Sequence, residues 1–294
     1  MIGFYLFLGF EKFLMFLPKK VRKSFFIALA NVAYLSSKRY KKVVHSNVKF
    51  VFGENIDEKF LDEITRYSFK QLALNFLYTM ELRYYSIDEL SKFVKFENED
   101  IVQKAKQKNK PIIFITSHYG AWELGGAMIS AKIEPLMIVY KKMNNKYFQD
   151  YLLKSREKSR ITYTERKGAT RALLKQLKNN GAIALLIDTN VNKKEAIEVD
   201  FLGHKTSQIK TTAYFARKFD ATIIPTLIHT EDDEHYTVKF YDEIKTQKTD
   251  NEEKDIKLSV QAQTDWLSKE ILKQPKPWFW LHRRWKNDYP EIYK

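Results

Sequence analysis

The fold of this chain depends on one segment, Pro111-Ile-Ile-Phe-Ile-Thr-Ser-His-Tyr-Gly-Ala-Trp-Glu-Leu-Gly-Gly126, in which a strand pattern turns into a helix pattern. Its first part, Ile112 to Thr116, is a run of β-branched and aromatic residues that is typical of a buried strand, and a helical pattern begins at Ala121. Two residues with acid–base chemistry, His118 and Glu123, lie at this junction. We therefore expect a functional site where the strand ends.

The spacing of His118 and Glu123 restricts how they can meet. On one regular helix they would point about 140° apart, because each residue turns the helix by roughly 100°. They can meet only if His118 stands in the turn and Glu123 in the first helical turn. The carboxylate would then accept a hydrogen bond from one imidazole nitrogen and leave the other free to take a proton. Gly120 would keep this turn tight.

A developing negative charge beside His118 would need fixed donors. Backbone N–H groups from Gly120 to Trp122, or the side chain of Arg166, are the candidates. The segment lacks the two histidines of an H-E-x-x-H zinc motif, so we expect no metal. Ser117 raises an acyl-enzyme alternative, but the sequence has no G-x-S-x-G elbow. A lone histidine after a strand is also compatible with a purely structural role.

Helix and strand patterns alternate along the rest of the chain. Before the central segment we expect helices at 57–85 (one or two), at 86–94 with a Ser86–Glu89 capping box, and at 98–110. After it we expect helices at 121–132, 145–158, 170–180 (stopped by Gly181), 207–219 (capped by Ser207) and 254–273, and strands at 136–140, 161–163, 183–187, 197–202, 222–228 and 236–241. This alternation predicts an α/β fold with a mixed, largely parallel central sheet flanked by helices. Ligands bind at the carboxyl ends of strands in such sheets, and both His118 and Asp188 follow a strand end.

The N-terminal segment has a different character. Residues Ile2 to Leu17 are apolar apart from Glu11 and Lys12, and the basic cluster Lys19-Lys20-Val21-Arg22-Lys23 follows them. As a helix this run is roughly 24 Å long, short of the ~30 Å hydrocarbon core of a bilayer. We therefore divide the chain into an N-terminal membrane anchor, residues 1–26, which lies in the interface or spans marginally, and a globular domain, residues 27–294. The alternative is a hydrophobic helix packed on the body of the protein.

The composition restricts the partners. The 294 residues carry a formal net charge of +15 at pH 7, and the sequence pI is about 9.5. This charge predicts an acidic partner: an anionic membrane, a lipid phosphate, an acidic carrier protein or nucleic acid. The absence of cysteine excludes a disulfide scaffold, a thiol nucleophile and thiolate metal sites. The basic run from Lys38 to His45 is typical of a solvated face.

Four blocks of the sequence resemble one bacterial enzyme family. They are His118-Tyr-Gly-Ala-Trp-Glu123-Leu-Gly, Glu165-Arg-Lys-Gly168, Ala184-Leu-Leu-Ile-Asp188 and Pro277-Trp-Phe-Trp-Leu-His-Arg-Arg-Trp285. The first block is similar to the H-x-x-x-W-E-L signature of the late, or secondary, acyltransferases of lipid A synthesis in Gram-negative bacteria, the lauroyl and myristoyl transferases. The likeness runs from about Asn47 to the C-terminus. One departure is Asp188-Thr189-Asn190, where many members have Asp-Gln or Asp-His.

The resemblance implies a membrane-bound O-acyltransferase that needs no cofactor. It would transfer a fatty acyl chain from acyl-carrier protein to a hydroxyl of the 3-hydroxyacyl chains of a lipid A precursor of the Kdo-lipid IVA type. His118 and Glu123 would be the catalytic general-base dyad. Substrate or carrier contacts would come from Arg166, Arg171, Asp188, Arg283 and Arg284. The enzyme would work at the cytoplasmic face of the inner membrane, with acyl-carrier protein, the lipid A precursor and anionic lipid as partners and no nucleic acid.

Several alternatives stay open. The chemistry suits a phospholipid or glycolipid O-acyltransferase with another acceptor equally well. A non-enzymatic basic protein that binds membrane or nucleic acid would also explain the charge. At the residue level, Arg166 and Arg171 also fit ordinary exposed helix charges, and Asp188 an ordinary strand-end carboxylate. Trp278, Trp280 and Trp285 fit either a wall against lipid or core packing.

Overall fold

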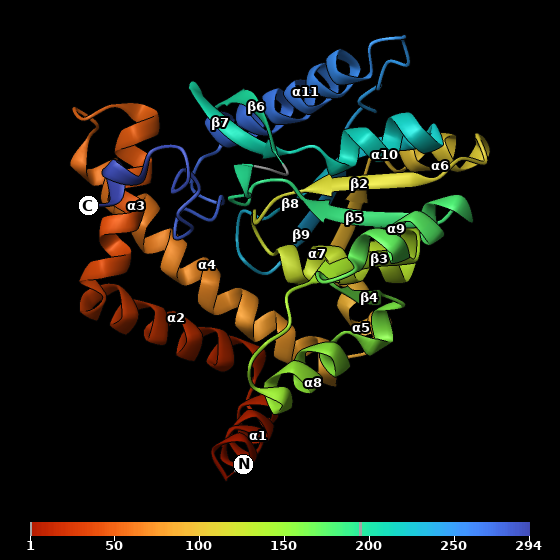
Figure 1. Cartoon of the computed structure of the whole chain (residues 1–294). Helices are drawn as coiled ribbons and strands as arrows, with labels where there is room; N and C mark the ends of the chain where they lie inside the picture. The colour runs from red at the N-terminus through yellow and green to blue at the C-terminus, as the bar shows by residue number, and fades with distance from the viewer. Residues whose placement is uncertain (1, 194–195) are drawn as a thin grey trace.

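The computed structural model describes residues 2–193 and 196–294, which form an α/β structure around a seven-stranded sheet (Figure 1). In spatial order the strands are β1 (Val94–Glu97), β9 (Tyr236–Phe240), β8 (Thr222–His229), β2 (Ile112–Thr116), β5 (Ala182–Leu186), β3 (Leu136–Tyr140) and β4 (Thr162–Glu165). The neighbouring strands are parallel except for the antiparallel pair β8 and β9. The expected mixed, largely parallel sheet is confirmed.

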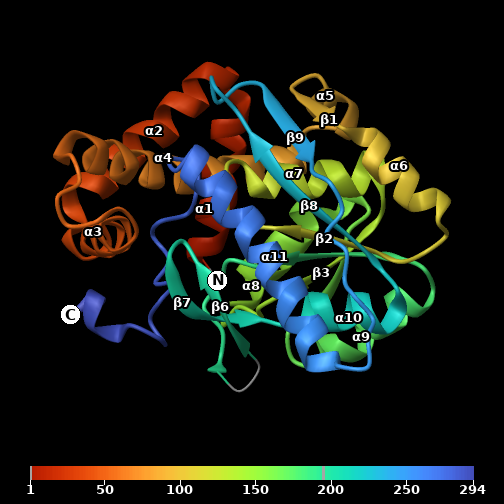
Figure 2. The same ribbon diagram turned by 90° about the horizontal axis from the view of Figure 1, so that it is seen from above.

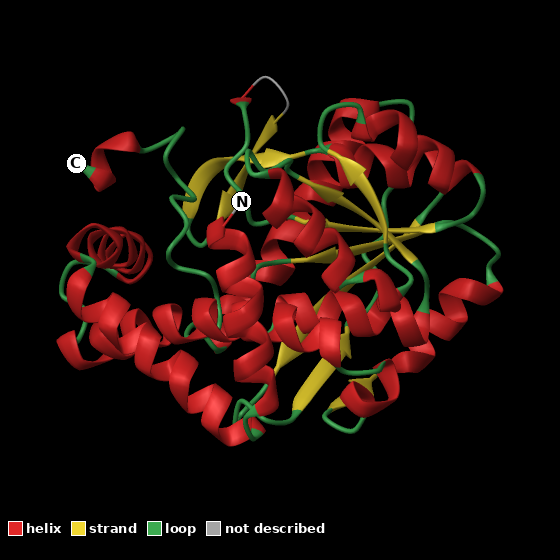
Figure 3. Ribbon diagram, turned by 90° about the horizontal axis from the view of Figure 1, so that it is seen from below, coloured by secondary structure: helices red, strands yellow, loops and turns green. Residues whose placement is uncertain are grey.

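Helices cover this sheet on both sides, as Figures 1 and 3 show. They are α1 (Ile2–Phe16), α2 (Lys19–Ser36), α3 (Lys38–Phe52), α4 (Glu58–Tyr84), α5 (Ile87–Ser91), α6 (Glu99–Gln107), α7 (Trp122–Met128), α8 (Lys146–Ser155), α9 (Ala169–Lys178), α10 (Thr211–Phe219) and α11 (Glu252–Lys273). Short turns of other helix types are η1 (Ile129–Ile133), η2 (Glu157–Ser159) and η4 (Pro290–Tyr293). A two-stranded hairpin, β6 (Ala196–Phe201) and β7 (His204–Ile209), lies beside α11 (Figure 2).

The core divides along the central strand because successive side chains of a strand point to opposite faces. Ile113 and Ile115 of β2 pack into a cluster with α9, α10, α11 and the C-terminal segment. Ile112 and Phe114 pack into a second cluster with α6, α7 and the C-terminal half of α4. The apolar run at β2 is thus explained by burial on both faces, as parallel sheets require.

The N-terminal helices pack onto α4 and α8. Arg22 of α2 is buried and forms an ion pair with Glu81 of α4 at 3.0 Å. Glu11 of α1 is buried and accepts a hydrogen bond from Tyr151 of α8 at 2.6 Å. None of the helices in residues 2–193 and 196–294 has the length and apolar content to cross a membrane. The boundary that we expected after residue 26 falls inside α2.

Two of the expected elements differ in the hairpin region. Ser207 lies in β7 and not at a helix start, and the helix begins at Thr211. The hydroxyl and backbone N–H of Ser207 both donate to Asp288, at 2.8 and 2.9 Å. The residue therefore serves a tertiary contact that its local sequence does not reveal.

The other differences concern short elements. The edge strand β1 has four residues and was missed: the helix expected at 86–94 overlaps only its first residue, and no element was predicted for residues 95–97. The helix expected at 121–132 is α7 followed by the π-helical turn η1. The helix expected to stop at Gly181 ends at Lys178, and Asn180 takes the left-handed conformation with φ of 52°. The Ser86–Glu89 capping box is confirmed, and residues 58–84 form one helix.

Candidate active site

The imidazole of His118 is held by the carboxylate of Asp188. Its Nδ1–H donates to Asp188 Oδ1 at 3.0 Å, and the backbone N–H of His118 donates to Oδ2 at 2.8 Å. The indole N–H of Trp278 donates to the same Oδ2 at 3.1 Å. Because a carboxylate only accepts, Nδ1 carries the proton and Nε2 is left as an acceptor. This arrangement can take a proton from a bound alcohol.

Sheet topology brings these two residues together. The parallel strands β2 and β5 are paired in register from Ile112 with Ala182 to Thr116 with Leu186. His118 and Asp188 each stand two residues beyond the last pair, so they leave the sheet at the same edge. Figure 1 shows the arrowheads of both strands pointing the same way, toward α4. His118 and Asp188 both follow the carboxyl ends of strands, as expected, and the pairing of β2 with β5 makes these two ends neighbours.

A tight turn at Gly120 fixes the approach to α7. Gly120 has φ of +58°, and a Cβ there would lie 2.2 Å from the carbonyl oxygen of Ile228. Its own carbonyl accepts from the side-chain amides of Gln71 and Asn75 on α4, each at 2.9 Å. Its N–H donates to the carbonyl of Pro277 at 3.0 Å. The expected tight turn is confirmed, but this N–H is already used and does not serve as an oxyanion donor.

Aromatic side chains from two segments surround the imidazole. The ring of Trp122 lies 5.3 Å from that of His118, and the ring of Phe279 lies 5.8 Å away, measured between centroids. The backbone N–H of Phe279 also donates to the carbonyl of His118 at 2.9 Å. Trp278, Trp280 and Trp285 are fully buried. Of the two alternatives for the tryptophans of the C-terminal block, a wall against lipid or core packing, their burial agrees with core packing.

The predicted hydrogen bond between Glu123 and His118 was wrong. Asp188 occupies Nδ1, and Glu123 forms an ion pair with Arg156, the residue that ends α8. The geometric reason is that Glu123 lies in the first turn of α7 and faces α8, whereas the neighbouring strand delivers Asp188 to the ring. Glu123 still acts on the histidine, because its charge contributes to raising the pKa of His118.

His118 and Asp188 each shift the pKa of the other in the direction that favours its charged form. Burial by itself lowers the pKa of His118, but the charge and hydrogen bond of Asp188 outweigh it, and the pKa is raised above 6.5. Burial by itself raises the pKa of Asp188, but the contacts with His118 outweigh it and the pKa is lowered. A proton on His118 is therefore stabilised, as a general base needs after it has accepted one.

The residues that we expected to bind substrate fall into separate places. Asp188 is committed to His118, as described above. Arg284 is fully buried and donates to Gln208 Oε1 at 2.6 Å and to the carbonyl of Ser207 at 3.1 Å, so a phosphate cannot reach it. It was misassigned because a buried arginine in an Arg-Arg pair looks like an exposed one. Its guanidinium instead holds β7 in place.

The remaining arginines are accessible. Arg166 and Arg171 are exposed where β4 leads into α9, and Arg283 is partly exposed beside the ring of Tyr293. None of the three forms a hydrogen bond or ion pair with His118 in the part of the chain that the structure describes. Ser117 is fully buried. In the same described residues, no group of three His, Asp or Glu side chains is placed to hold a metal ion.

Sequence reasoning missed Arg156, Gln71 and Asn75. Nothing local distinguishes Arg156 from the other basic residues of the chain. Gln71 and Asn75 did carry a signal, because they are polar residues four positions apart on the buried face of α4. Buried polar side chains need partners, and their partner here is the Gly120 turn.

An acid-oriented imidazole at the carboxyl ends of two parallel strands of an α/β sheet is an arrangement typical of enzymes that use a general base. The chain belongs to the bacterial lipid A biosynthesis acyltransferase family, whose sequence model matches residues 1–287. The resemblance of the four sequence blocks is thereby confirmed. Membership of the family implies an acyl donor and a lipid A precursor as substrates.

Two curated proteins show a more distant similarity. One is the lipid A biosynthesis palmitoleoyltransferase of Escherichia coli (strain K12), which is 20% identical over 251 residues, covering 85% of this chain and 79% of that protein. The other is the lipid A biosynthesis acyltransferase of Shigella flexneri, with the same identity and coverage.

Proposed function

We propose that this enzyme transfers a fatty acyl chain from acyl-carrier protein to a hydroxyl of the 3-hydroxyacyl chains of a lipid A precursor of the Kdo-lipid IVA type. The observation that supports this most is the free Nε2 of an imidazole whose other nitrogen is held by a buried carboxylate. A lipid hydroxyl is a poor nucleophile until a base takes its proton. Because the side chain of His118 is 25% exposed, a hydroxyl can approach it from outside.

In the proposed mechanism His118 Nε2 takes the proton of the acceptor hydroxyl. The alkoxide oxygen attacks the thioester carbonyl carbon and forms a tetrahedral oxyanion. When this collapses, the C–S bond breaks, the ester is left on the lipid, and the imidazolium returns its proton to the departing thiolate. Asp188 keeps Nδ1 protonated and stabilises the imidazolium throughout.

The tetrahedral oxyanion needs a positive partner. We assign this role to Arg156, which forms an ion pair with Glu123, the acid whose charge acts on His118. The side chain of Arg156 is 17% exposed and that of Glu123 is 20% exposed, so the pair is shielded but still reachable. A fixed donor of this kind contributes about 3 kcal/mol in measured oxyanion sites. In this revised form Glu123 is catalytic through Arg156 and not through a bond to the imidazole.

We also propose that α1 and α2 rest on the cytoplasmic face of the inner membrane. Large apolar side chains are exposed along both helices: Ile2, Tyr5, Leu6, Phe10, Phe13 and Phe16 on α1, and Val21, Leu29, Val32 and Leu35 on α2. An exposed apolar surface of this extent is typical of an interaction with a membrane or a partner.

Arg166, Arg171 and Arg283 remain candidates for contacts with substrate phosphates, because they are accessible.

Reconstituted enzyme tests the function directly. The full-length protein is incubated in mixed micelles with acyl-carrier protein loaded with a range of acyl chains and with Kdo-lipid IVA, and the products are read by mass spectrometry. We expect one added acyl ester in the lipid product and none with His118→Ala. A parallel assay offers phosphatidylglycerol, lysophospholipid and a glycolipid as acceptors. Acylation of one of these alone, with the lipid A precursor unchanged, would overturn the proposed acceptor.

A further inference from the structure

Helix α3 carries a stripe of positive charge on its outer side. The stripe consists of Lys38, the adjacent pair Lys41 and Lys42, His45 and Lys49, so that its charges recur every three to four residues along the helix. At 1.5 Å per residue the stripe is roughly 16 Å long, and at about 100° per residue its members share one face. The opposite face of the helix carries the buried residues Val43, Val44, Asn47 and Val48. One face of α3 therefore packs against the protein, and the other carries the positive charge.

Three lysines of this stripe have no acidic partner in the described part of the chain. Of its lysines, Lys49 pairs with Glu54 at 3.6 Å and Lys41 lies over the ring of Tyr34. In residues 2–193 and 196–294 no acidic partner is found for Lys38, Lys41 or Lys42. Lysines on the other side of the molecule are different. Acidic side chains pair with Lys104, Lys106, Lys108, Lys110 and Lys132. The charge on α3 is thus left for a partner.

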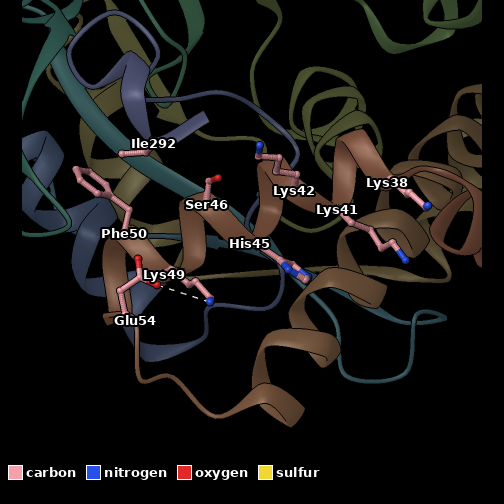
Figure 4. Close-up of a pocket in the computed structure, with 9 residues that line it drawn as sticks. All are labelled: Lys38, Lys41, Lys42, His45, Ser46, Lys49, Phe50, Glu54 and Ile292. Atoms are coloured by element: carbon pink, nitrogen blue, oxygen red, sulfur yellow. Dashed lines mark ion pairs between the residues drawn. The ribbon is translucent and has the colours of Figure 1, made fainter. Parts of the chain in front are cut away.

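The stripe forms the wall of a groove and not a flat surface. Figure 4 shows the lining side chains along α3 together with Ile292, which comes from the C-terminal turn η4. The cavity has a volume of about 470 Å³. Phe50 and Ile292 give it an apolar end beside the lysines (Figure 4). A groove of this kind suits an amphipathic acidic segment that has an apolar residue at one end.

The surroundings distinguish a protein partner from a bilayer. Stable binding to a membrane surface needs apolar side chains that enter the acyl region in addition to charge. Among the described residues, the large apolar side chains exposed on the N-terminal helices lie on α1 and α2, and α3 exposes only Tyr40. The charge of α3 is therefore not accompanied by the apolar surface that membrane insertion requires.

We propose that the groove along α3 is the docking site for an acidic helix of the acyl-carrier protein. The inference rests on the proposed function, which makes that carrier the donor. Its basis is charge complementarity: acidic side chains of the carrier helix would pair with Lys38, Lys41 and Lys42, which have no acidic partner among the described residues. Electrostatic steering of this kind raises the rate of association and selects the partner.

The inner face of the same helix connects the groove with the site. Asn47, opposite the basic stripe, donates from its side-chain amide to the carbonyls of Trp280 and His282, at 2.7 and 2.8 Å. These residues belong to the C-terminal block in which Phe279 donates to the His118 carbonyl. A carrier on α3 would thus rest on the element that supports the catalytic imidazole.

The test uses the full-length protein in mixed micelles and compares two charge reversals. Lys38→Glu/Lys42→Glu changes the groove, and Lys175→Glu/Lys178→Glu makes the same charge change on the exposed side of α9. Direct binding of acyl-carrier protein is measured by calorimetry at two salt concentrations, in a His118→Ala background so that nothing is turned over. We expect the groove variant to weaken binding at least about tenfold and the α9 variant to leave it nearly unchanged, with salt weakening wild-type binding.

A second measurement separates this inference from the proposed function. With intact His118, the groove variant should raise KM for the carrier-bound donor and leave kcat unchanged, while turnover of acyl-coenzyme A or an acyl-pantetheine is unaffected. Wild-type protein that binds the carrier through the groove yet transfers no acyl chain would refute the proposed function and keep the docking site. Equal binding by both variants would refute the docking site. The docking site would also be refuted if the groove variant lost binding to phosphatidylglycerol vesicles and kept its binding to the carrier. That result would show that the groove binds lipid.

Discussion

The two acidic side chains at the edge of the sheet have opposite environments. Asp188 is 3% exposed and accepts three hydrogen bonds, two from His118 and one from Trp278. Glu123 is 20% exposed, and its side chain is bonded to Arg156 alone among the described residues. A buried carboxylate that already accepts three hydrogen bonds can orient its partners but cannot contact a substrate. A carboxylate that stays accessible can influence groups of a bound substrate. Glu123, the acid in the same sequence motif as His118, is therefore not the acid that orients the imidazole, and Asp188 has that role.

The largest effect is expected at the imidazole that both acids influence. Replacing His118 by Ala removes the proton acceptor, so we expect kcat to fall by about 10³-fold, within the range found for general bases. Association with vesicles should be unchanged, because the exposed apolar residues lie on α1 and α2. The measurement is steady-state turnover with acyl-carrier protein and the lipid A precursor, beside vesicle flotation. Normal turnover would remove His118 from the mechanism.

The second largest loss of activity is expected at Asp188, the buried acid. In Asp188→Asn the amide can no longer fix the Nδ1–H tautomer or stabilise the imidazolium, so we expect kcat to fall about 10²-fold or more. Asp188→Ala should lose as much activity and also stability, because three donors are left without an acceptor. Circular dichroism and thermal unfolding separate the two effects. Asp188→Asn with full activity would return the orienting role to another residue.

A smaller loss of activity is expected at Glu123, the accessible acid, because it acts through Arg156. We expect Glu123→Gln and Arg156→Gln each to lower kcat by about 10- to 10²-fold, because one fixed positive donor is weakened or lost. The double variant should be no worse than the worse single one, since the two side chains act as a unit. Turnover of the four proteins in a double-mutant cycle measures this. Fully additive losses would show that Glu123 acts independently of Arg156.

The smallest effect is expected at the indole that completes the sealed site. Trp278→Phe keeps the packing but removes one of the three donors to Asp188, so the free energy of unfolding should fall by about 2 kcal/mol. Turnover should fall less than about tenfold, because both bonds to His118 remain. Urea unfolding and steady-state rates give the two numbers. A loss as large as that of Asp188→Asn would mean that the indole, and not the imidazole, determines where Asp188 lies.

The fold was predictable because its signals are local. The buried strand at Ile112, the alternation of helices and strands and the capping box at Ser86 are all properties of short windows, and the structure has them. Ser207 was misassigned because its partner Asp288 is far away in the sequence. The short edge strand at Val94 was missed because its partner, the strand at Tyr236, is equally remote.

The site was only half predictable for the same reason. His118 and its turn at Gly120 follow from one segment, and so does the position of Asp188 after a strand. That the strands of His118 and Asp188 are neighbours in register depends on strand order, which the sequence does not display. Arg156 reaches Glu123 from the C-terminal end of α8, which packs on α4, and Arg284 is buried by contacts with a remote hairpin. Local spacing favoured Glu123, and topology selected Asp188.

The pH dependence of kcat/KM, compared among wild type, Asp188→Asn and Glu123→Gln, tests the central claim most directly. A base must be neutral to accept a proton, so activity should rise with pH through a pKa above 6.5, since the pKa of His118 is raised. Removing the charge of Asp188 should move this inflection to lower pH, because burial alone lowers the pKa. Removing that of Glu123 should move it less, because the contribution of Glu123 is the smaller one. An inflection that follows Glu123 and ignores Asp188 would contradict the account.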